Sequence, residues 1–377
     1  MADRQLRILH VLSALHTGGV ENMLLTYYSH MSKRDFHFDF VVHRDSIGVL
    51  ESSFEELGSR VYHIPALSES ILGNLLALRA ILKSNDYDCV HFHLGYYAYF
   101  SMLLTRKMLP EASMLLHSHI ALEPLNFIQN ATKVLLTRGS NRIADVWCAC
   151  GHDAGVFQYG GKAVDSKRVN IVFNAIEIGK FEFDFLAREV HRDELKLKKR
   201  FVLGHVGRLT YQKNQQFLVD VFNQVHDKAP DAALVLIGAG EDEENIEKQI
   251  QLHGLEGSVY LLGARLDAYE LFNAFDMFVL PSRYEGLGIT LIEAQANGLK
   301  SLASTSVPNE VNVSGLVEFL PLDIALWVDR ILSLKALGLG RTNNHSIMME
   351  SNYNILNEAK KLEDLYVESK VRKGQTS

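Results

Sequence analysis

Short apolar runs alternate with longer stretches of helical pattern along almost the whole chain, and this rhythm constrains the fold more than any other feature. The runs span residues 8–12, 38–42, 89–92 and 114–116 in the first half and 202–206, 234–237, 259–262 and 277–280 in the second. Runs of this kind, each followed by a turn and then a helix, are typical of parallel β-α units. Because the runs form two series, the sequence predicts an α/β protein with two doubly wound domains.

The boundary between the two series falls in a charged connection. Residues 180–200 are dense in charge and show no strand pattern, which favours mixed helix and loop. We therefore expect an N-terminal domain at residues 1–180 and a C-terminal domain at residues 181–350. Apolar side chains then recur near helical spacing at Ile355, Leu362, Leu365 and Tyr366. This spacing predicts a closing helix within residues 351–377, which we expect to pack back on the first domain.

The composition argues against several classes of protein. A length of 377 residues with 47% hydrophobic content is enough for two cores, and a net charge of −7 argues against a nucleic-acid partner. The cysteines, Cys89, Cys148 and Cys150, include no CxxC pair, so neither a disulfide framework nor a zinc site is indicated. The N-terminus lacks the long apolar stretch of a secretory signal, and no apolar run is long enough to span a membrane. A cytoplasmic protein is the expectation.

A basic stretch leaves membrane contact open. Lys133, Arg138 and Arg142 accompany the apolar residues 134–136 in a predicted helix. A helix of this composition can lie on an anionic lipid surface, as a peripheral protein at the inner face of the membrane does. A solvated basic face on a core helix gives the same pattern, so both interpretations stand.

The first loop of the second domain, at residues 207–214, carries two cations. Arg208 offers a forked guanidinium and Lys213 a compact ammonium. Together they can stabilise the negative charge that develops on a departing nucleoside diphosphate, without a metal ion. A surface salt-bridge cluster is the alternative interpretation.

A second loop, at residues 282–294, sets two carboxylates, a glycine turn and a helix start together. Glu285 follows an apolar run and Glu293 lies inside the next helix, so both can face one crevice. Backbone N–H groups at a helix start can hold an anion, and carboxylates can accept hydrogen bonds from sugar and ribose hydroxyls. The donor-binding residues expected in this turn are Gly286, Leu287, Gly288 and Ile289. An ordinary strand-turn-helix with surface glutamates is the alternative.

Three further loops carry weaker signals. His16, Gly18 and Gly19 lie in the first strand-helix loop of the first domain, which faces the ligand crevice in α/β folds. Gly238 follows a strand of the second domain, but its loop lacks the third glycine of GxGxxG and argues little for NAD. Arg265 lies in another crevice loop, whose backbone can contact a nucleobase. We expect the glycines and Arg265 to bind the donor, a sugar attached to a diphosphate, and His16 to bind the acceptor of that sugar. The alternative is that these residues only form tight turns between a strand and a helix.

Histidines gather at the ends of two apolar runs. His117 and His119 alternate at one end, and His91 and His93 alternate at another. We expect His119 in the active site and His117 at the acceptor. Alternation also allows a metal pair, but spacing assigns no third ligand, and buried structural histidines are the other interpretation.

An Asp-Tyr-Asp sequence at residues 86–88 has the form of a metal-binding DxD. It precedes its apolar run, so we expect it at the amino edge of the sheet, away from the ligand crevice. We interpret it as a solvated turn.

In these segments the chain resembles the retaining glycosyltransferases of family 4, which have the GT-B fold, and especially their bacterial exopolysaccharide or capsule type. The resemblance covers nearly the full length and is carried by residues 18–21, 117–119, 172–177, 207–214 and 285–293. It implies two Rossmann-like domains facing a central cleft. The first would bind mainly the acceptor and the second mainly the nucleotide sugar.

The resemblance also implies roles for single residues. Arg208 and Lys213 resemble the pair that binds the diphosphate, and Glu285 resembles a contact to the donor sugar. Glu293 resembles the acid that binds ribose, and His119 the histidine near the transferred sugar. In such enzymes the departing diphosphate lies on the face of the incoming hydroxyl and helps to take its proton, which retains the anomeric configuration. The catalytic residues implied are His119, Arg208, Lys213 and Glu285.

The expected function is metal-independent transfer of a hexosyl unit from a nucleotide sugar, UDP-linked, to a lipid-linked glycan in exopolysaccharide or capsule assembly. No cofactor is expected, because the nucleotide sugar is a substrate. Two other functions fit the same residues: a noncatalytic nucleotide-sugar-binding subunit of a transferase complex, and a nucleotide-sugar epimerase.

Overall fold

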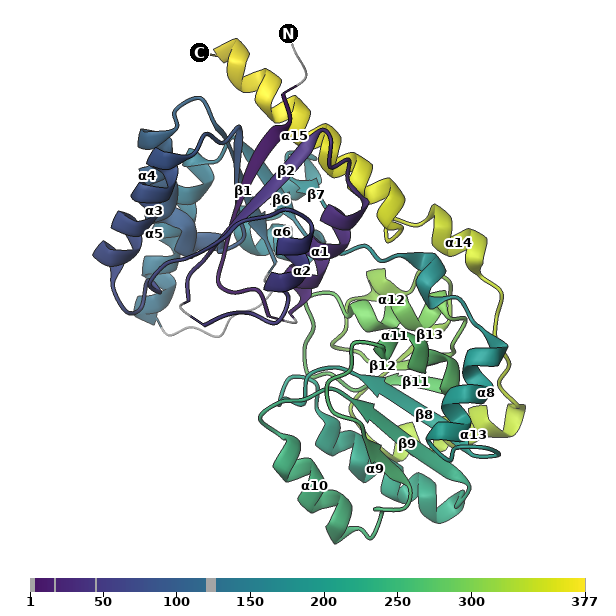
Figure 1. The fold of residues 1–377 in the computed structure, drawn as a ribbon. Helices are drawn as coiled ribbons and strands as arrows, with labels where there is room; N and C mark the ends of the chain where they lie inside the picture. The colour runs from purple at the N-terminus through teal and green to yellow at the C-terminus, as the bar shows by residue number, and fades with distance from the viewer. Residues whose placement is uncertain (1–3, 17, 45, 120–126, 377) are drawn as a thin grey trace. The chain divides into compact units, whose positions relative to one another are not determined.

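The computed structural model describes residues 4–16, 18–44, 46–119 and 127–376, and the chain forms two compact units (Figure 1). Unit 1 comprises Met1–Ala175 and Ile355–Ser377, and unit 2 comprises Ile176–Asn354. The unit boundaries thus fall after residues 175 and 354, whereas the sequence predicted them at residues 180 and 350. The two ends of unit 2 lie at these boundaries because Ile176 and Asn354 pair in a parallel β-bridge.

Unit 1 is built on a parallel sheet with the strand order β3-β2-β1-β4-β5-β6-β7. Its strands are β1 (Leu6–Leu12), β2 (Phe36–Val42), β3 (Val61–His63), β4 (Cys89–Phe92), β5 (Ser113–Ser118), β6 (Val146–Ala149) and β7 (Asn170–Ile171). Its helices are α1 (Gly19–His30), α2 (Glu51–Glu56), α3 (Ile71–Ser84), η1 (Gly95–Ala98), α4 (Tyr99–Met108), α5 (Phe127–Ile143), α6 (His152–Tyr159), α7 (Gly161–Asp165) and α15 (Ile355–Thr376). The strand order reverses between β1 and β4, which is where folds of this kind form a ligand crevice.

Alternation along the strands of unit 1 creates a core on each face of the sheet. Ile8 of β1 packs in one cluster with residues of α1 and α15, whereas Leu9 packs in another with residues of α3 and α4. Helix α15, yellow in Figure 1, is fixed to the sheet by polar contacts as well. Tyr366 Oη lies 2.7 Å from His91 Nδ1, and Ser113 Oγ donates to the Ser369 carbonyl at 2.8 Å. The last helix therefore closes the core of unit 1.

Unit 2 repeats this plan with a parallel sheet of order β10-β9-β8-β11-β12-β13. Its strands are β8 (Phe201–Val206), β9 (Ala232–Ile237), β10 (Val259–Leu261), β11 (Met277–Leu280), β12 (Ser301–Ser304) and β13 (Val317–Leu320). Its helices are η2 (Ile178–Phe181), α8 (Phe185–Glu194), α9 (Gln215–Lys228), α10 (Glu243–Leu252), α11 (Ala268–Leu271), η3 (Phe272–Ala274), α12 (Ile289–Ala296), η4 (Asn309–Val311), α13 (Ile324–Leu337) and α14 (His345–Glu350). The strand order reverses between β8 and β11, so their following loops adjoin.

The charged connection at residues 180–200 contains helix α8. Arg188 and Arg192 on this helix both donate to the carboxylate of Asp276, just before β11. These ion pairs are largely shielded from solvent, so α8 belongs firmly to unit 2.

The Asp-Tyr-Asp sequence is not the solvated turn that we expected. Tyr87 and Asp88 are buried, and the Tyr87 hydroxyl donates to Asp39 at 3.0 Å. Asp88 accepts from the backbone N–H of Arg7 at 3.0 Å and pairs with Arg4. Both carboxylates of this network already have cationic or N–H partners, which explains why they can be buried.

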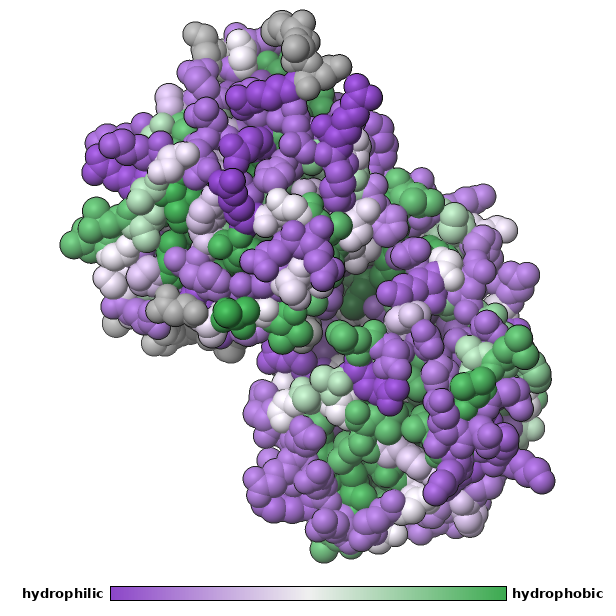
Figure 2. Space-filling model, in the orientation of Figure 1, coloured by the Kyte–Doolittle hydropathy of each residue, from purple (hydrophilic) through white to green (hydrophobic). Residues whose placement is uncertain are grey.

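Polar side chains cover much of the visible face of both units, with apolar side chains interspersed (Figure 2). Among the helices that the structure describes, none combines the length and the apolarity needed to cross a bilayer.

Candidate active site

The residues expected to bind the donor in unit 2 follow strands at the carboxyl edge of its sheet. Arg208 and Lys213 lie between β8 and α9, and Gly238 follows β9. Glu285 lies between β11 and α12, and Glu293 is inside α12. Because β8 is hydrogen-bonded to both β9 and β11, the loop that carries the two cations lies between the other two loops.

Gly238 allows the loop after β9 to approach the cationic loop closely. Its φ is 143°, and a Cβ at this position would lie 2.0 Å from the carbonyl oxygen of Gly207. The backbone N–H of Leu209 donates to the Ala239 carbonyl at 3.1 Å. The loop after β9 thus supports the backbone beside Arg208, and any side chain at position 238 would push the two loops apart.

Lys213 and Glu285 form an ion pair between the two neighbouring loops, with Nζ 2.6 Å from Oε1. The Glu285 side chain is only 6% exposed, and the Ser282 hydroxyl donates to the same oxygen at 2.6 Å. Gln212 Nε2 donates to the Tyr284 carbonyl at 3.1 Å and joins the same loops. The ammonium and the carboxylate are therefore held in fixed positions before any ligand arrives.

Arg208 has quite different surroundings. Its side chain is exposed and forms no hydrogen bond or ion pair with any other residue that the structure describes. Its backbone, however, is fixed, because Gln215 Nε2 donates to the Arg208 carbonyl at 2.8 Å. His205 holds Gln215 in turn, with its Nε2 3.0 Å from Gln215 Nε2 and its Nδ1 donating to the Val279 carbonyl. Arg208 is thus a free cation on an ordered loop.

Glu293 has a strongly shifted pKa, as residues of functional sites often do. Burial raises the pKa of Glu293 to about 7, while the positive charges of Lys213 and Lys180 favour its ionised form. The carboxylate has no hydrogen-bond partner within the described residues. It therefore shares the electrostatic surroundings of Lys213 and remains available to accept hydrogen bonds from a ligand.

The turn before α12 has the conformation that an anion seat requires. Gly288 is the N-cap with φ 89°, in the left-handed region, and no side chain caps the helix. The first backbone N–H groups of a helix have no intrahelical acceptor, so those at Ile289 and the next residue stay open to a ligand. Leu287 is buried under this turn and Gly286 is half-buried. These four residues shape the helix start but contribute no side-chain polar group.

Arg265 is already engaged. Its Nε donates to Asp267 Oδ1 at 2.8 Å and its Nη2 to Asp267 Oδ2 at 2.5 Å. A guanidinium with a bidentate carboxylate partner has less to offer an anionic ligand. The structure therefore gives less support to Arg265 as a donor contact than to Arg208.

Three expected residues of unit 1 lie around the start of α1. Gly19 begins the helix and Gly18 is its N-cap, while His16 is half-buried in the loop before them. A Cβ on Gly18 would lie 2.3 Å from Glu21 Oε2, a flexible side-chain atom. The helix start has no side-chain cap, so its N–H groups too are open to an anion.

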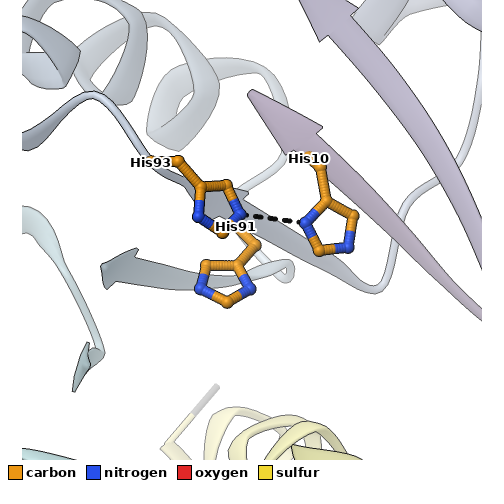
Figure 3. Close-up of side chains that lie close together, drawn as sticks. All are labelled: His10, His91 and His93. Carbon is orange, nitrogen blue, oxygen red and sulfur yellow. Dashed lines mark hydrogen bonds between the residues drawn. The ribbon is translucent and has the colours of Figure 1, made fainter. Parts of the chain in front are cut away.

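Five histidines form a layer on one face of the sheet of unit 1. They come from the carboxyl-terminal parts of β1, β4 and β5 and are His10, His91, His93, His117 and His119. The Nδ1 of His10 lies 3.0 Å from His93 Nε2, a hydrogen bond drawn as a dashed line in Figure 3, and His93 Nδ1 lies 2.9 Å from His119 Nε2. Both alternating pairs were predicted from the sequence, but His10 was not, because its place in the layer comes from the pairing of β1 with β4.

Burial keeps these imidazoles neutral. It lowers the pKa of His10 and of His119 to about 3, and it lowers the pKa of His91 well below the ordinary value. Each neutral ring carries one N–H, so if His10 donates to His93, then His93 must donate to His119, and the reverse also holds. The tautomers of His10, His93 and His119 are therefore coupled.

His117 is fully buried and neither of its ring nitrogens has a hydrogen-bond partner. Contact of this ring with an acceptor thus finds no support in the structure. His119 lies at the edge of the layer, where it lines a small pocket with His93, Tyr96 and Gln158. Of the two histidines predicted at the end of β5, only His119 is placed to meet a ligand.

Two family models match this chain, one for each unit. Residues 17–179 match Glycosyltransferase Family 4, and residues 187–316 match Glycosyl transferases group 1. EpsF of Bacillus subtilis (strain 168), a protein named as a glycosyltransferase, is 31% identical over 346 residues, which cover 90% of each chain. The chain belongs to glycosyltransferase family 4.

Other members and solved structures match over nearly the full length of this family 4 glycosyltransferase. A galactosyltransferase of Escherichia coli, named as UDP-Gal:alpha-D-GlcNAc-diphosphoundecaprenol alpha-1,3-galactosyltransferase, is 24% identical and covers 98% of each chain. The crystal structure of Anabaena Alr3699/HepE in complex with UDP and glucose superposes with a TM-score of 0.79 at 19% identity, over 96% of this chain and 99% of that one. With WaaG, a glycosyltransferase involved in lipopolysaccharide biosynthesis, the TM-score is 0.64 at 14% identity. The predicted GT-B fold, with its two Rossmann-like units, is confirmed.

Proposed function

We propose that this glycosyltransferase moves a hexosyl unit from a UDP-linked sugar to a lipid-linked glycan during exopolysaccharide or capsule assembly, with retained configuration and no metal at the diphosphate. The observation that carries the proposal is the arrangement in unit 2 of the Lys213–Glu285 pair, with Arg208 and Glu293 on the same group of loops. Unit 2 is accordingly the donor domain and unit 1 the acceptor domain.

The two cations act on the leaving group. As the bond between the sugar C1 and the diphosphate oxygen breaks, negative charge grows on the diphosphate. The free guanidinium of Arg208, the ordered ammonium of Lys213 and the N–H groups at the start of α12 would all stabilise that charge. Because these groups are in place beforehand, little reorganisation is needed during the reaction.

The two carboxylates orient the donor. Glu285 would accept hydrogen bonds from sugar hydroxyls through the oxygen that Lys213 and Ser282 do not occupy, and Glu293 from the ribose hydroxyls. The acceptor oxygen bonds to C1 on the face that the diphosphate leaves, and its proton passes to a diphosphate oxygen. His119 would stand near the transferred sugar, at the pocket edge of the histidine layer.

The names of two relatives support the donor and acceptor classes. The Escherichia coli relative is named for a UDP-linked donor and a diphosphoundecaprenol-linked acceptor. The Anabaena protein is solved in complex with UDP and glucose, and also with UDP-glucose. A lipid-linked acceptor would bring the chain to the cytoplasmic face of the membrane, and α5 offers the exposed side chains of Val134 and Leu135 for peripheral contact.

A donor panel followed by product analysis tests the proposal. Thermal shift with UDP- and GDP-linked hexoses identifies the donor, and mass spectrometry of reactions with polyprenyl-diphosphate-linked glycans in EDTA identifies the product. We expect addition of one hexosyl residue, with the anomeric configuration of the donor by NMR. Donor binding without transfer or hydrolysis would instead indicate a noncatalytic subunit, and isomerised donor without acceptor an epimerase.

A further inference from the structure

Three histidines at the ends of β4 and β5 bring ring nitrogens together. One nitrogen from each of His93, His117 and His119 lies within 4.8 Å of the other two. Spacing along the chain gave His117 and His119 as a pair without a third ligand, and the neighbouring strand supplies His93. We propose that these three side chains bind a divalent transition-metal ion, and that Zn²⁺ matches the site best.

The site contains nitrogens that lack partners. Both ring nitrogens of His117 and Nδ1 of His119 are buried without a hydrogen-bond partner. Buried polar atoms of this kind are rare in folded proteins, because each loses its bonds to water and gains nothing in return. A metal ion bound by His117 would satisfy one of its two nitrogens directly.

His93 is oriented as a metal ligand should be. Its Nδ1 lies 2.9 Å from His119 Nε2, so the two rings are hydrogen-bonded in the absence of a metal ion. An ion with Zn–N bonds of about 2.0–2.1 Å in a tetrahedron separates its nitrogens by about 3.3 Å, so the rings need to part by less than about half an ångström. His93 Nε2 would then donate to His10 Nδ1, which lies 3.0 Å away, and this outer bond would fix the ligand's tautomer.

The ligand set selects the kind of metal. All three ligands are imidazoles, and each offers one ring nitrogen to the same point of the histidine layer. Neutral imidazoles suit Zn²⁺, Co²⁺, Ni²⁺ and Cu²⁺, whereas Mg²⁺ and Ca²⁺ prefer oxygen ligands. The site is thus separate in chemistry from a carboxylate-held metal at a sugar diphosphate.

Access distinguishes this trio from the other close trio of the layer. His10, His91 and His93, drawn in Figure 3, also bring nitrogens within 4.8 Å of one another, but His10 and His91 are fully buried and are not among the residues that line the pocket. His119 instead borders the pocket that Tyr96 and Gln158 line. An ion can enter from this side, and the fourth coordination position can hold water.

One consequence rests on the proposed function. An ion bound to His119 would hold this ring away from the transferred sugar, so metal and donor would compete. By linkage, each would then weaken the binding of the other to the same degree. The metal site itself does not depend on that role for His119.

The test uses the full chain without a polyhistidine tag, stripped with EDTA and then titrated with Co²⁺. Three imidazoles and a water in a tetrahedron give Co²⁺ intense visible absorption bands. We expect one equivalent of Co²⁺ with these bands, displaced by Zn²⁺ and not by Mg²⁺. Absence of the bands at stoichiometric Co²⁺ would overturn the proposal while leaving the proposed transferase function intact.

Two variants test whether His119 is a ligand of the metal ion. His119→Ala changes a half-buried ligand at the end of β5, so the chain should fold, and we expect a loss of Co²⁺ affinity of about tenfold or more. His152→Ala removes an exposed histidine of the same unit as a matched control, and its affinity should equal that of the parent chain. Equal affinity in His119→Ala and the parent would overturn the assignment. Thermal stabilisation by Zn²⁺ of the parent and of His152→Ala, but not of His119→Ala, would support it.

Discussion

Lys213 and Arg208 carry the same charge in different surroundings, and this difference separates their effects on stability and on catalysis. Lys213 neutralises the nearly buried carboxylate of Glu285, whereas Arg208 is exposed and forms no ion pair with the described residues. Removing Lys213 leaves a carboxylate without its cation in a low-dielectric setting. Removing Arg208 leaves no group unpaired.

We therefore expect Arg208→Ala to lower kcat/KM by on the order of 10²–10³-fold with an unchanged melting temperature. Lys213→Ala should lower kcat/KM similarly and also reduce the free energy of unfolding by about 1–3 kcal/mol. Steady-state kinetics and urea unfolding measure the two effects. Arg372→Ala, which removes an exposed arginine on α15, is the control and should change neither. Equal stability losses in the Arg208 and Lys213 variants would contradict the account.

Glu293 makes the stability of unit 2 depend on pH in an unusual direction. Its pKa is raised by burial to about 7, so between the ordinary value of 4.5 and 7 the folded chain binds more protons than the unfolded chain. Stability therefore falls as pH rises through this window. Glu293→Gln removes the ionisation and should make the ligand-free chain more stable at pH 8, by on the order of 1–3 kcal/mol, with little difference at pH 4.5. Urea unfolding of both proteins at pH 8 and pH 4.5 measures the difference. A Glu293→Gln variant that is less stable than the parent chain at pH 8 would refute the raised pKa of Glu293.

The histidine layer is a property of three paired strands, β1, β4 and β5. Its rings are buried and neutral in the folded state, whereas a histidine in the unfolded chain takes up a proton near pH 6.5. The unfolded state thus binds more protons below pH 6.5, and stability falls as the pH falls. Each such histidine lowers the free energy of unfolding by roughly 1.4 kcal/mol for each pH unit below pH 6.5.

Unit 1 should consequently unfold in mild acid before unit 2, where His205 is the buried histidine whose pKa is lowered, to about 4. Trp147 lies in unit 1 and Trp327 in unit 2, so the variants Trp147→Phe and Trp327→Phe report on one unit each. We expect the urea midpoint of unit 1 to fall much more than that of unit 2 between pH 7 and pH 5. Parallel falls in the two midpoints would mean that the histidines are not buried and neutral.

Gly238, in the loop after β9, lies directly against the backbone of the loop that carries Arg208. Gly238→Ala places a Cβ against the Gly207 carbonyl, whereas Gly254→Ala meets open space at a φ of 64°. Gly254→Ala should cost about 1 kcal/mol from backbone strain alone. Gly238→Ala should cost at least about twice as much and should lower transferase activity as well, because the Arg208 loop moves. Urea unfolding and kinetics of both variants check this, and equal costs would show that the two loops do not meet closely.

Across the whole chain, apolar patterning predicted β1, β2, β4 and β5 of the first sheet and β8, β9, β10 and β11 of the second. Runs such as residues 8–12 and 277–280 are long enough or apolar enough to be recognised, and both appear as β1 and β11. The pattern missed β3, β6, β7, β12 and β13. Of these, β7 has two residues and β12 reads Ser-Leu-Ala-Ser, whereas β6 reads Val-Trp-Cys-Ala and is as apolar as the strands that were predicted. Segments such as β7 and β12 become strands because a neighbour offers hydrogen bonds, which no local pattern records.

The site was predictable to the extent that single loops carry it. Arg208, Lys213, Glu285 and Glu293 follow from turn chemistry after strands. The Lys213–Glu285 pair and the contribution of His10 arise from contacts between distant segments, so they needed the structure. One signal was present for His10, since a polar residue inside an apolar run at residues 8–12 needs a buried partner.

The most direct test of the account is transfer itself, measured by mass spectrometry with a UDP-hexose and a polyprenyl-diphosphate-linked glycan in excess EDTA. We predict that the parent chain extends the glycan by one hexosyl residue and that Arg208→Ala does so on the order of 10²–10³-fold more slowly. A parent chain that transfers only when a divalent metal is restored, or an Arg208→Ala variant as fast as the parent, would contradict the claim that the cations of unit 2 stabilise the departing diphosphate.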